Sequence, residues 1–195
     1  LAEPFRIPSD SMMPTLFDGD FILVNKYAYG LRVPVTNAKV IPVGQPARGD
    51  VVVFRYPGMG PNDPTKGSDY IKRVIGLPGD EVTYRGRTLY VNGVQVATLP
   101  DGSYSGTTRS KDYVNYTRVT EKLPELEHGI LLGPPPGFAG GPEGTWRVAD
   151  GQFLVMGDNR SNSLDGRVWG MVPEANLVGK AFVIYQGHHG DAGAH

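Results

Sequence analysis

The amino-acid sequence predicts a mostly β protein in which antiparallel strands are joined by turns. Glycine and proline are abundant, at 27 and 17 of the 195 residues, and both residue types interrupt helices and favour turns. The apolar runs between them are short and rich in β-branched side chains, which is typical of strands. We therefore expect a β-rich core and not a helical bundle.

Five apolar runs are the strand candidates, and one pair of runs also predicts a hairpin. Asn92-Gly93 separates two alternating segments within residues 88–96, and this dipeptide supplies the two positive-φ residues of a type I′ turn. We therefore expect a tight hairpin over 88–96. The strand candidates are residues 21–25, 50–56, 69–75, 81–84 and 178–185.

The composition changes between residues 98 and 149, where Ser, Thr, Gly and Pro dominate. Such a stretch is expected to form long loops and to contribute little continuous core. The sequence thus predicts a discontinuous core from residues 1–80 and 152–187. A smaller inserted β region at 81–151 would interrupt that core, and residues 188–195 would form a flexible tail.

The composition also excludes several classes of function. The formal net charge is −1, which gives no basic field for nucleic acid. Cysteine is absent, so the chain has neither a disulfide framework nor a thiol nucleophile. No window approaches the roughly 18 to 20 apolar residues of a membrane span. The acidic spacing in 157–167 does not fit a calcium loop, and we expect no metal and no cofactor.

Ser11 and Lys72 are the residues with candidate chemistry. Ser11 lies in the segment Ile7-Pro-Ser-Asp-Ser-Met-Met-Pro14, and Lys72 lies in the apolar run 69–75. A serine hydroxyl becomes a good nucleophile only when a neighbouring group accepts its proton. Bulky apolar neighbours would desolvate the lysine ammonium and lower its pKa, so the neutral amine could serve as that acceptor.

Histidine, the usual proton acceptor, is poorly placed in this sequence. His128 falls in the stretch expected to form loops, and the other histidines, His188, His189 and His195, fall in the tail. A Ser-His-Asp triad is therefore not expected. Arg73, next to the lysine, is expected to be an ordinary exposed charge.

A third segment, Gly157-Asp-Asn-Arg-Ser-Asn-Ser-Leu-Asp-Gly-Arg167, completes the pattern. With the segments around Ser11 and Lys72 it resembles the bacterial type I signal peptidases, the serine proteases that remove signal peptides from exported preproteins. The resemblance runs in order through residues 4–30, 48–83 and 152–185. It implies a signal-peptidase-like antiparallel β catalytic core with a smaller, loop-rich β insertion.

The resemblance implies a role for each polar residue of these segments. Ser11 would be the nucleophile and Lys72 the general base, and the Ser9 hydroxyl would join the Ser11 backbone N–H in an oxyanion hole. Ser163 would orient the lysine amine. Further polar residues would hold the site together, and they are Asp158, Asp165 and Arg167.

Asp10 stands where many family members carry glycine. A carboxylate facing Lys72 would raise the pKa of the lysine and oppose its function as a base. We therefore expect Asp10 to point to solvent.

The same resemblance implies the substrate. Family members cleave after small residues at the −1 and −3 positions of a signal peptide, and an extended substrate would add main-chain hydrogen bonds by β-augmentation. Large apolar side chains would form the walls of the small pockets. The matching positions are Phe5, Ile7, Met12, Leu16, Ile22, Val53, Tyr70 and Ile71.

Three alternative functions compete with this one. A penicillin-binding or β-lactamase-type acyl enzyme is disfavoured because Ser-x-x-Lys and Lys-Thr-Gly are absent. A self-cleaving Ser-Lys relative of the repressor type would need a DNA-binding helical domain that this sequence lacks. A non-catalytic β-rich peptide-binding module stays open, and a turnover assay would decide it.

Partners and location follow from the resemblance as well. The expected partners are the signal peptides of secretory preproteins and a membrane lipid surface, the latter contacted by Phe5, Phe138 and Trp146. The expected location is the bacterial inner membrane, with the catalytic domain on the periplasmic side. Because the chain opens at Leu1 and family members carry N-terminal anchors, we expect the membrane anchor to be missing from it.

Overall fold

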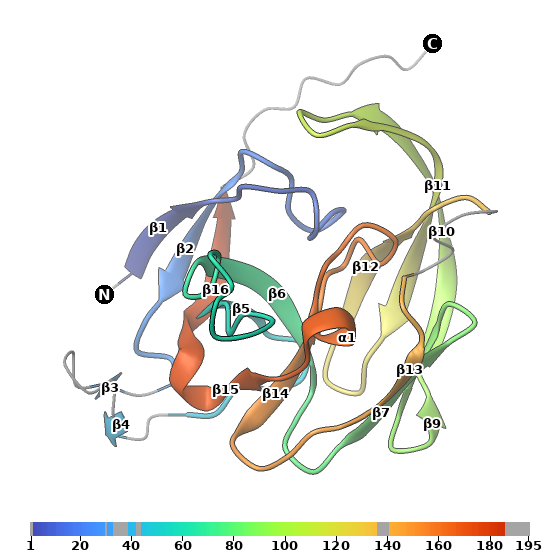
Figure 1. Cartoon of the computed structure of the whole chain (residues 1–195). Helices are drawn as coiled ribbons and strands as arrows, with labels where there is room; N and C mark the ends of the chain where they lie inside the picture. Colours follow the sequence, from blue (N-terminus) through green and yellow to red (C-terminus); the bar gives the residue numbers. More distant parts are fainter. Residues whose placement is uncertain (1, 30, 33–38, 42–43, 136–140, 186–195) are drawn as a thin grey trace.

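The computed structural model describes residues 2–29, 31–32, 39–41, 44–135 and 141–185. Named strands in this part of the chain pair only in the antiparallel sense, which confirms the predicted fold class (Figure 1). Within the same described ranges, no helix has the length and apolar character needed to cross a membrane. Among the described residues, helical structure is limited to α1 (Gly166–Trp169) and the 3-10 helix η1 (Glu174–Asn176). The strands are β1 (Ala2–Arg6), β2 (Phe21–Asn25), β3 (Leu31–Arg32), β4 (Lys39–Ile41), β5 (Val51–Arg55), β6 (Asp69–Gly76), β7 (Glu81–Arg85), β8 (Thr88–Val91), β9 (Val94–Gln95), β10 (Ala97–Thr107), β11 (Asp112–Lys122), β12 (Glu127–Leu132), β13 (Gly144–Arg147), β14 (Gln152–Met156), β15 (Val172–Pro173) and β16 (Leu177–Tyr185).

The largest sheet draws its strands from both ends of the chain. Its order is β1-β2-β16-β5-β6-β14-β15, so strands before residue 77 and after residue 151 alternate within it. The intervening stretch forms a four-stranded sheet, β13-β7-β8-β9, and a three-stranded sheet, β10-β11-β12. In Figure 1 the β10–β13 region lies beside the larger sheet. The division into two domains at residues 80 and 152 stays an interpretation, and the predicted tail at 188–195 lies outside the described residues.

The strand candidates and the hairpin are confirmed. The runs correspond to β2, β5, β6, β7 and β16, with ends that differ by at most one residue. At the turn between β8 and β9, Asn92 has φ 52° and Gly93 has φ 78°, as a type I′ turn requires.

The prediction of long loops over 98–149 is wrong for much of that stretch. β10 and β11 are 11 residues long each, and β12 extends the same sheet. Almost every residue of β10 is exposed, so the side chains on both faces of this strand contact solvent. The strand therefore needs few apolar residues. Buried side chains of the neighbouring strands, among them Tyr113, Ile130 and Leu131, supply the apolar contacts.

Strand β6 is the central element of the core. Residues 71–76 are all buried, and three apolar clusters include residues from this strand and its neighbours. Ile71, Val74 and Ile75 each belong to a different one of these clusters. Any charged side chain in this part of β6 is therefore removed from water.

A buried ionic network joins the three-stranded sheet to the large sheet. Arg160 donates to both carboxylate oxygens of Glu121, at 2.7 and 2.8 Å. His128 Nε2 lies 3.0 Å from Glu121 Oε1, and its Nδ1 lies 3.3 Å from Asp158 Oδ1. Burial opposes protonation of His128, but the carboxylates on both sides outweigh it and raise its pKa. The geometry favours an imidazolium that bridges two carboxylates.

We predict that His128→Gln destabilises the protein more in mild acid than in mild base. The pKa of His128 is higher in the folded state than the unfolded value, so its stabilising contribution is complete below about pH 6.5 and is lost as the pH rises through the folded pKa. The expected loss in free energy of unfolding is about 2 kcal/mol near pH 5.5. Chemical denaturation of both proteins near pH 5.5 and near pH 8.5 measures it.

Lys122→Gln is the matched control, because Lys122 makes an exposed ion pair with Glu127 on the same two strands. This variant should show no comparable pH dependence. A destabilisation by His128→Gln that stays constant across the two pH values would contradict the bridging imidazolium.

Candidate active site

Ser11 and Lys72 meet although 61 positions separate them in the chain. Ser11 lies in the turn that follows β1, and Lys72 lies in the buried part of β6. Lys72 Nζ is 2.8 Å from Ser11 Oγ, and the Ser9 hydroxyl donates to the same Oγ at 3.2 Å. Ser11 is 8% exposed and Lys72 is 5% exposed, so both residues are buried.

Burial changes the protonation of Lys72. Desolvation lowers its pKa from 10.5 to about 8, while the charges of Asp165 and Asp158 oppose part of that shift. A substantial fraction of the amine is therefore neutral near pH 8. A neutral amine at hydrogen-bond distance from a hydroxyl can accept its proton.

The segment 157–167 holds the nucleophile turn from the other side. The Asn159 backbone N–H donates to the Ser11 carbonyl at 3.0 Å. A Cβ atom on Gly157 would lie 2.6 Å from that carbonyl oxygen and 2.2 Å from Ser163 Oγ, so only glycine permits this close approach.

Ser163 lines the same cavity as Ser11 and Lys72, but the predicted hydrogen bond is not made. Its buried hydroxyl has no hydrogen-bond partner among the described residues. A role for Ser163 in orienting the lysine amine therefore stays a prediction.

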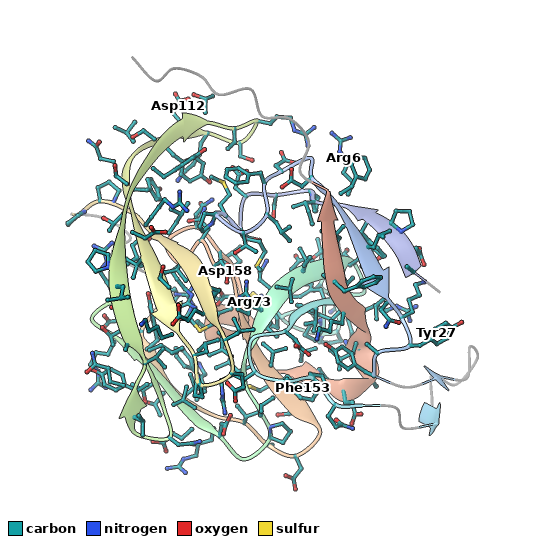
Figure 2. The ribbon with its side chains drawn as sticks, turned by 180° about the vertical axis from the view of Figure 1, so that it is seen from behind. Arg6, Tyr27, Arg73, Asp112, Phe153 and Asp158 are labelled. Atoms are coloured by element: carbon teal, nitrogen blue, oxygen red, sulfur yellow. The ribbon has the colours of Figure 1, made fainter. Side chains whose placement is uncertain are left out.

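Arg73 is buried, at 4% exposed, so the expectation of an ordinary exposed charge is wrong. Its Nε and NH2 groups donate to the two Asp158 oxygens at 2.9 and 2.8 Å, and its NH1 group donates to the Gly49 carbonyl at 2.7 Å. Figure 2 shows Arg73 and Asp158 together in the interior. The bidentate partner is the reason that this cation can be buried.

Asp165 and Arg167 form a second bidentate pair. Asp165 accepts from Arg167 Nε and NH2, each at 2.9 Å, and from the Gly157 backbone N–H at 2.9 Å. Asp165 is also the N-cap of α1. Burial opposes ionisation of Asp165, but Arg167 and these hydrogen bonds lower its pKa. Both predicted carboxylates of the segment, Asp158 and Asp165, are thus ionised and paired with arginine.

A cavity of about 1120 Å³ opens beside Ser11 and Lys72. Tyr70 and Ile71 are the only two of the predicted wall residues that line it among the residues the structure describes. The other six pack in or against one apolar cluster next to the nucleophile turn, and they are Phe5, Ile7, Met12, Leu16, Ile22 and Val53.

Asp10 does not point to solvent as expected. It is 2% exposed, and its carboxylate accepts from Thr108 Oγ1 at 2.5 Å and from the Tyr113 hydroxyl at 3.0 Å. These hydroxyls replace water, so the side chain turns toward strands β10 and β11.

The predicted lipid-contacting aromatics are differently placed. Trp146 is partly buried and packs against the cluster that contains Val82 and Tyr84, which contradicts a surface role for the whole ring. Phe5 is also partly buried, and Phe138 lies outside the described residues.

Sequence reasoning missed two polar residues at the site. Arg73 could have been found from Asp158, because a carboxylate in a buried segment needs a cationic partner. His128 had no such signal, since its approach to Asp158 depends on how β12 is placed against the 157–167 segment.

Residues 1–186 match the family model described as "Signal peptidase, peptidase S26". The chain is 48% identical to "Signal peptidase I" of Pseudomonas aeruginosa over 95% of this chain and 65% of that protein. It is 47% identical to the Pseudomonas fluorescens protein of the same name, with the same two coverages. The chain thus spans 65% of the length of both relatives.

One solved structure is also similar to this chain. A crystal structure of a signal peptidase I from Enterococcus faecalis V583 is 26% identical, with a TM-score of 0.40, and the match covers 70% of this chain and 97% of that one. The match of the family model extends from the first residue to residue 186 and includes all three segments of the site. On that match, the chain belongs to the signal peptidase family, peptidase S26.

Proposed function

We propose that this chain is a serine endopeptidase that removes signal peptides from exported preproteins, with Ser11 and Lys72 as a catalytic dyad. The observation that carries the proposal is the 2.8 Å contact between Lys72 Nζ and Ser11 Oγ in a buried setting. A lysine whose pKa is lowered to about 8 at a cavity wall has the property that a general base needs. A peptide-binding groove without turnover has no use for that property.

The proposed reaction begins when neutral Lys72 takes the proton of the Ser11 hydroxyl. Ser11 Oγ attacks the carbonyl carbon of the scissile bond, and the resulting oxyanion is held by the Ser11 backbone N–H and the Ser9 hydroxyl. The lysine ammonium then protonates the leaving amine. Departure of this amine leaves an acyl-enzyme at Ser11. Water, deprotonated by the same amine, attacks the ester and releases the signal peptide.

The buried ion pairs support this chemistry by fixing the surroundings of the lysine. Asp158 and Asp165 are the two acids that raise the pKa of Lys72, and each is engaged by an arginine. Desolvation is nevertheless the larger influence on the pKa of the amine. Ser163, which lies in the same cavity, would orient the amine once substrate is bound.

The substrate is proposed to lie extended along the cavity. Pro8 and Ser9 line one part of it, and Asp69, Tyr70 and Ile71 of strand β6 line another, so the substrate would run between these two segments and form main-chain hydrogen bonds with the strand. The apolar cluster behind the nucleophile turn is already filled by its own side chains. Selection of small residues at −1 and −3 rests on the resemblance to the family, and two peptides that differ at −1 test it.

We predict that Ser11→Ala and Lys72→Ala each abolish nearly all cleavage of a signal-peptide substrate, while the double variant is scarcely slower. Residues that act as one unit are non-additive in this way. The expected loss is at least about 10³-fold in kcat for each variant. Turnover is measured with a peptide carrying alanine at −1 and −3, and circular dichroism checks the fold.

The same peptide with tryptophan at −1 is the substrate control, and the unaltered protein should cleave it far more slowly. Independent, multiplicative losses in the two single variants would show that Lys72 is not the base for Ser11. Equal cleavage of the two peptides would contradict the proposed selection of small residues.

We predict that kcat/KM rises with pH along an acidic limb whose apparent pKa is about 8. The sign follows from the mechanism, because the proton on Lys72 must be absent before it can accept one from Ser11. Activity should fall about tenfold for each pH unit below that value. A limb near pH 6.5 would instead indicate an imidazole base.

We propose a membrane-associated location on the periplasmic face of the bacterial inner membrane, where signal peptides are exposed. The side chains that support contact with lipid are Phe21 and Phe182, which are 48% and 50% exposed on the neighbouring strands β2 and β16.

We predict that this chain co-sediments with phospholipid vesicles and that the double variant Phe21→Ser with Phe182→Ser binds the vesicles less. Leu99→Ser on β10 is a control of similar exposure, and equal binding of all three proteins would contradict the lipid surface.

A further inference from the structure

Asp10 connects the nucleophile turn to the far end of the β10–β11 hairpin. Its Oδ2 atom accepts from Thr108, which directly follows β10, and from Tyr113 near the start of β11. Figure 1 shows this end of the hairpin arching toward the segment that follows β1. The buried carboxylate is therefore a contact between two parts of the chain that are about 100 positions apart.

The hairpin reaches the same segment at a second point. Arg109, at the tip, makes a two-fold contact with Asp18, and one of the two bonds joins Nε to Oδ2 at 2.9 Å. Asp18 and Asp10 lie on opposite sides of Ser11 in the sequence, so the hairpin is tied to the chain before and after the nucleophile. The acceptor carboxylates of both tethers are buried, with the Asp18 side chain 5% and Asp10 2% exposed, but the donors differ, since the Arg109 side chain is 63% exposed and Tyr113 is buried.

The main chain of Asp10 is held as firmly as its side chain. Its carbonyl accepts from Asn159 Nδ2 and from the Met13 backbone N–H, both at 3.1 Å. The Tyr113 hydroxyl that donates to Asp10 also accepts from Asn162 Nδ2 at 2.9 Å. Asp10 thus links the hairpin and the 157–167 segment, one peptide bond away from Ser11.

The shape of the hairpin makes this contact attainable. The β10–β11 ladder shifts register between Pro100 and Ser103 and again between Tyr104 and Gly106. Asn115 adopts φ 53°, a left-handed conformation that asparagine tolerates, and its backbone N–H donates to Ser105 Oγ at 3.0 Å. Bulges of this kind bend and twist a ribbon, and this ribbon bends over the nucleophile turn.

We propose that Asp10 is a positioning residue, which uses the β10–β11 hairpin to hold Ser11 Oγ at hydrogen-bond distance from Lys72. The inference rests on the proposed function, in which that distance decides the rate. A displacement of about 1 Å at a reacting atom can cost about 100-fold in rate. Asp10 acts through geometry alone, because the acids whose charge acts on Lys72 are Asp165 and Asp158.

The test compares Asp10→Ala and Asp10→Asn with Arg109→Gln as the matched control. Asp10→Ala should lower kcat about 30- to 100-fold with KM changed less than about threefold, because the turn is loosened and the substrate-binding walls are intact. Asp10→Asn should stay within about fivefold of the unaltered protein, since the amide oxygen can accept from both hydroxyls. Arg109→Gln removes only the outer tether and should stay within about twofold.

Two further readouts separate positioning from a general loss of structure. The acidic limb of the pH profile should keep its apparent pKa in Asp10→Ala, since the environment of Lys72 is unchanged. Thr108→Val alone should lower kcat about fivefold, yet add little when combined with Asp10→Ala. The single Thr108 variant also serves as the test if Asp10→Ala does not fold, because it keeps Asp10 and its bond from Tyr113.

The outcomes distinguish this inference from the proposed function. Unaltered protein that cleaves no better than Ser11→Ala overturns the proposed function. Active protein whose kcat is unaffected by Asp10→Ala and Thr108→Val overturns the positioning role. A shifted acidic limb in Asp10→Ala, or a loss in Arg109→Gln as large as in Asp10→Ala, overturns it as well.

Discussion

The burial of one lysine amine beside one serine hydroxyl is the constraint on which the rest of the structure depends. An ammonium is strongly hydrated, and the apolar surroundings of β6 lower the pKa of Lys72 to about 8. This unfavourable burial is tolerated because the neighbouring strands and clusters pack tightly around β6. Within this packing, the Lys72 amine lies 2.8 Å from the Ser11 hydroxyl.

Two carboxylates close to a lysine would ordinarily restore its charge. In this protein Asp158 and Asp165 lie near Lys72, but Arg73 and Arg167 bind them in bidentate geometry. Each acid therefore keeps its charge, and desolvation still outweighs the two charges in setting the pKa of the amine. Since both arginines are buried, loss of Arg167 would remove the arginine bound to Asp165, and loss of Arg73 would leave Asp158 with His128 as its cationic neighbour, so either loss would disturb the electrostatics of the site.

The β10–β12 region contributes to the site although it supplies neither Ser11 nor Lys72. His128 connects it to Asp158 through the buried ionic network, and Thr108 and Tyr113 connect it to Asp10. Asp10 belongs to the segment around Ser11, and Asp158 belongs to the 157–167 segment that holds it, so these contacts reach both segments that meet at Ser11. A region whose composition is dominated by small and polar residues thus reaches the centre of the molecule through a few buried polar side chains.

The sequence by itself determined the elements whose signals are local. Alternating apolar residues and the Asn92-Gly93 turn specify strands and a hairpin because the backbone preferences of a few neighbouring residues decide them. Ordered segments around Ser11 and Lys72 were also sufficient to indicate the family. These features require no knowledge of how distant parts of the chain pack.

Only the tertiary structure decided the partners of the buried charges. Arg73 and Asp10 read as exposed groups in the sequence, since nothing local indicates that Asp158 and Tyr113 come to meet them. The polar stretch after residue 98 read as loops because a strand exposed on both faces, as β10 is, lacks the apolar alternation that marks a strand in the sequence. Each of these features depends on pairing between residues far apart in sequence, and burial, not local propensity, determines the environment of a charge.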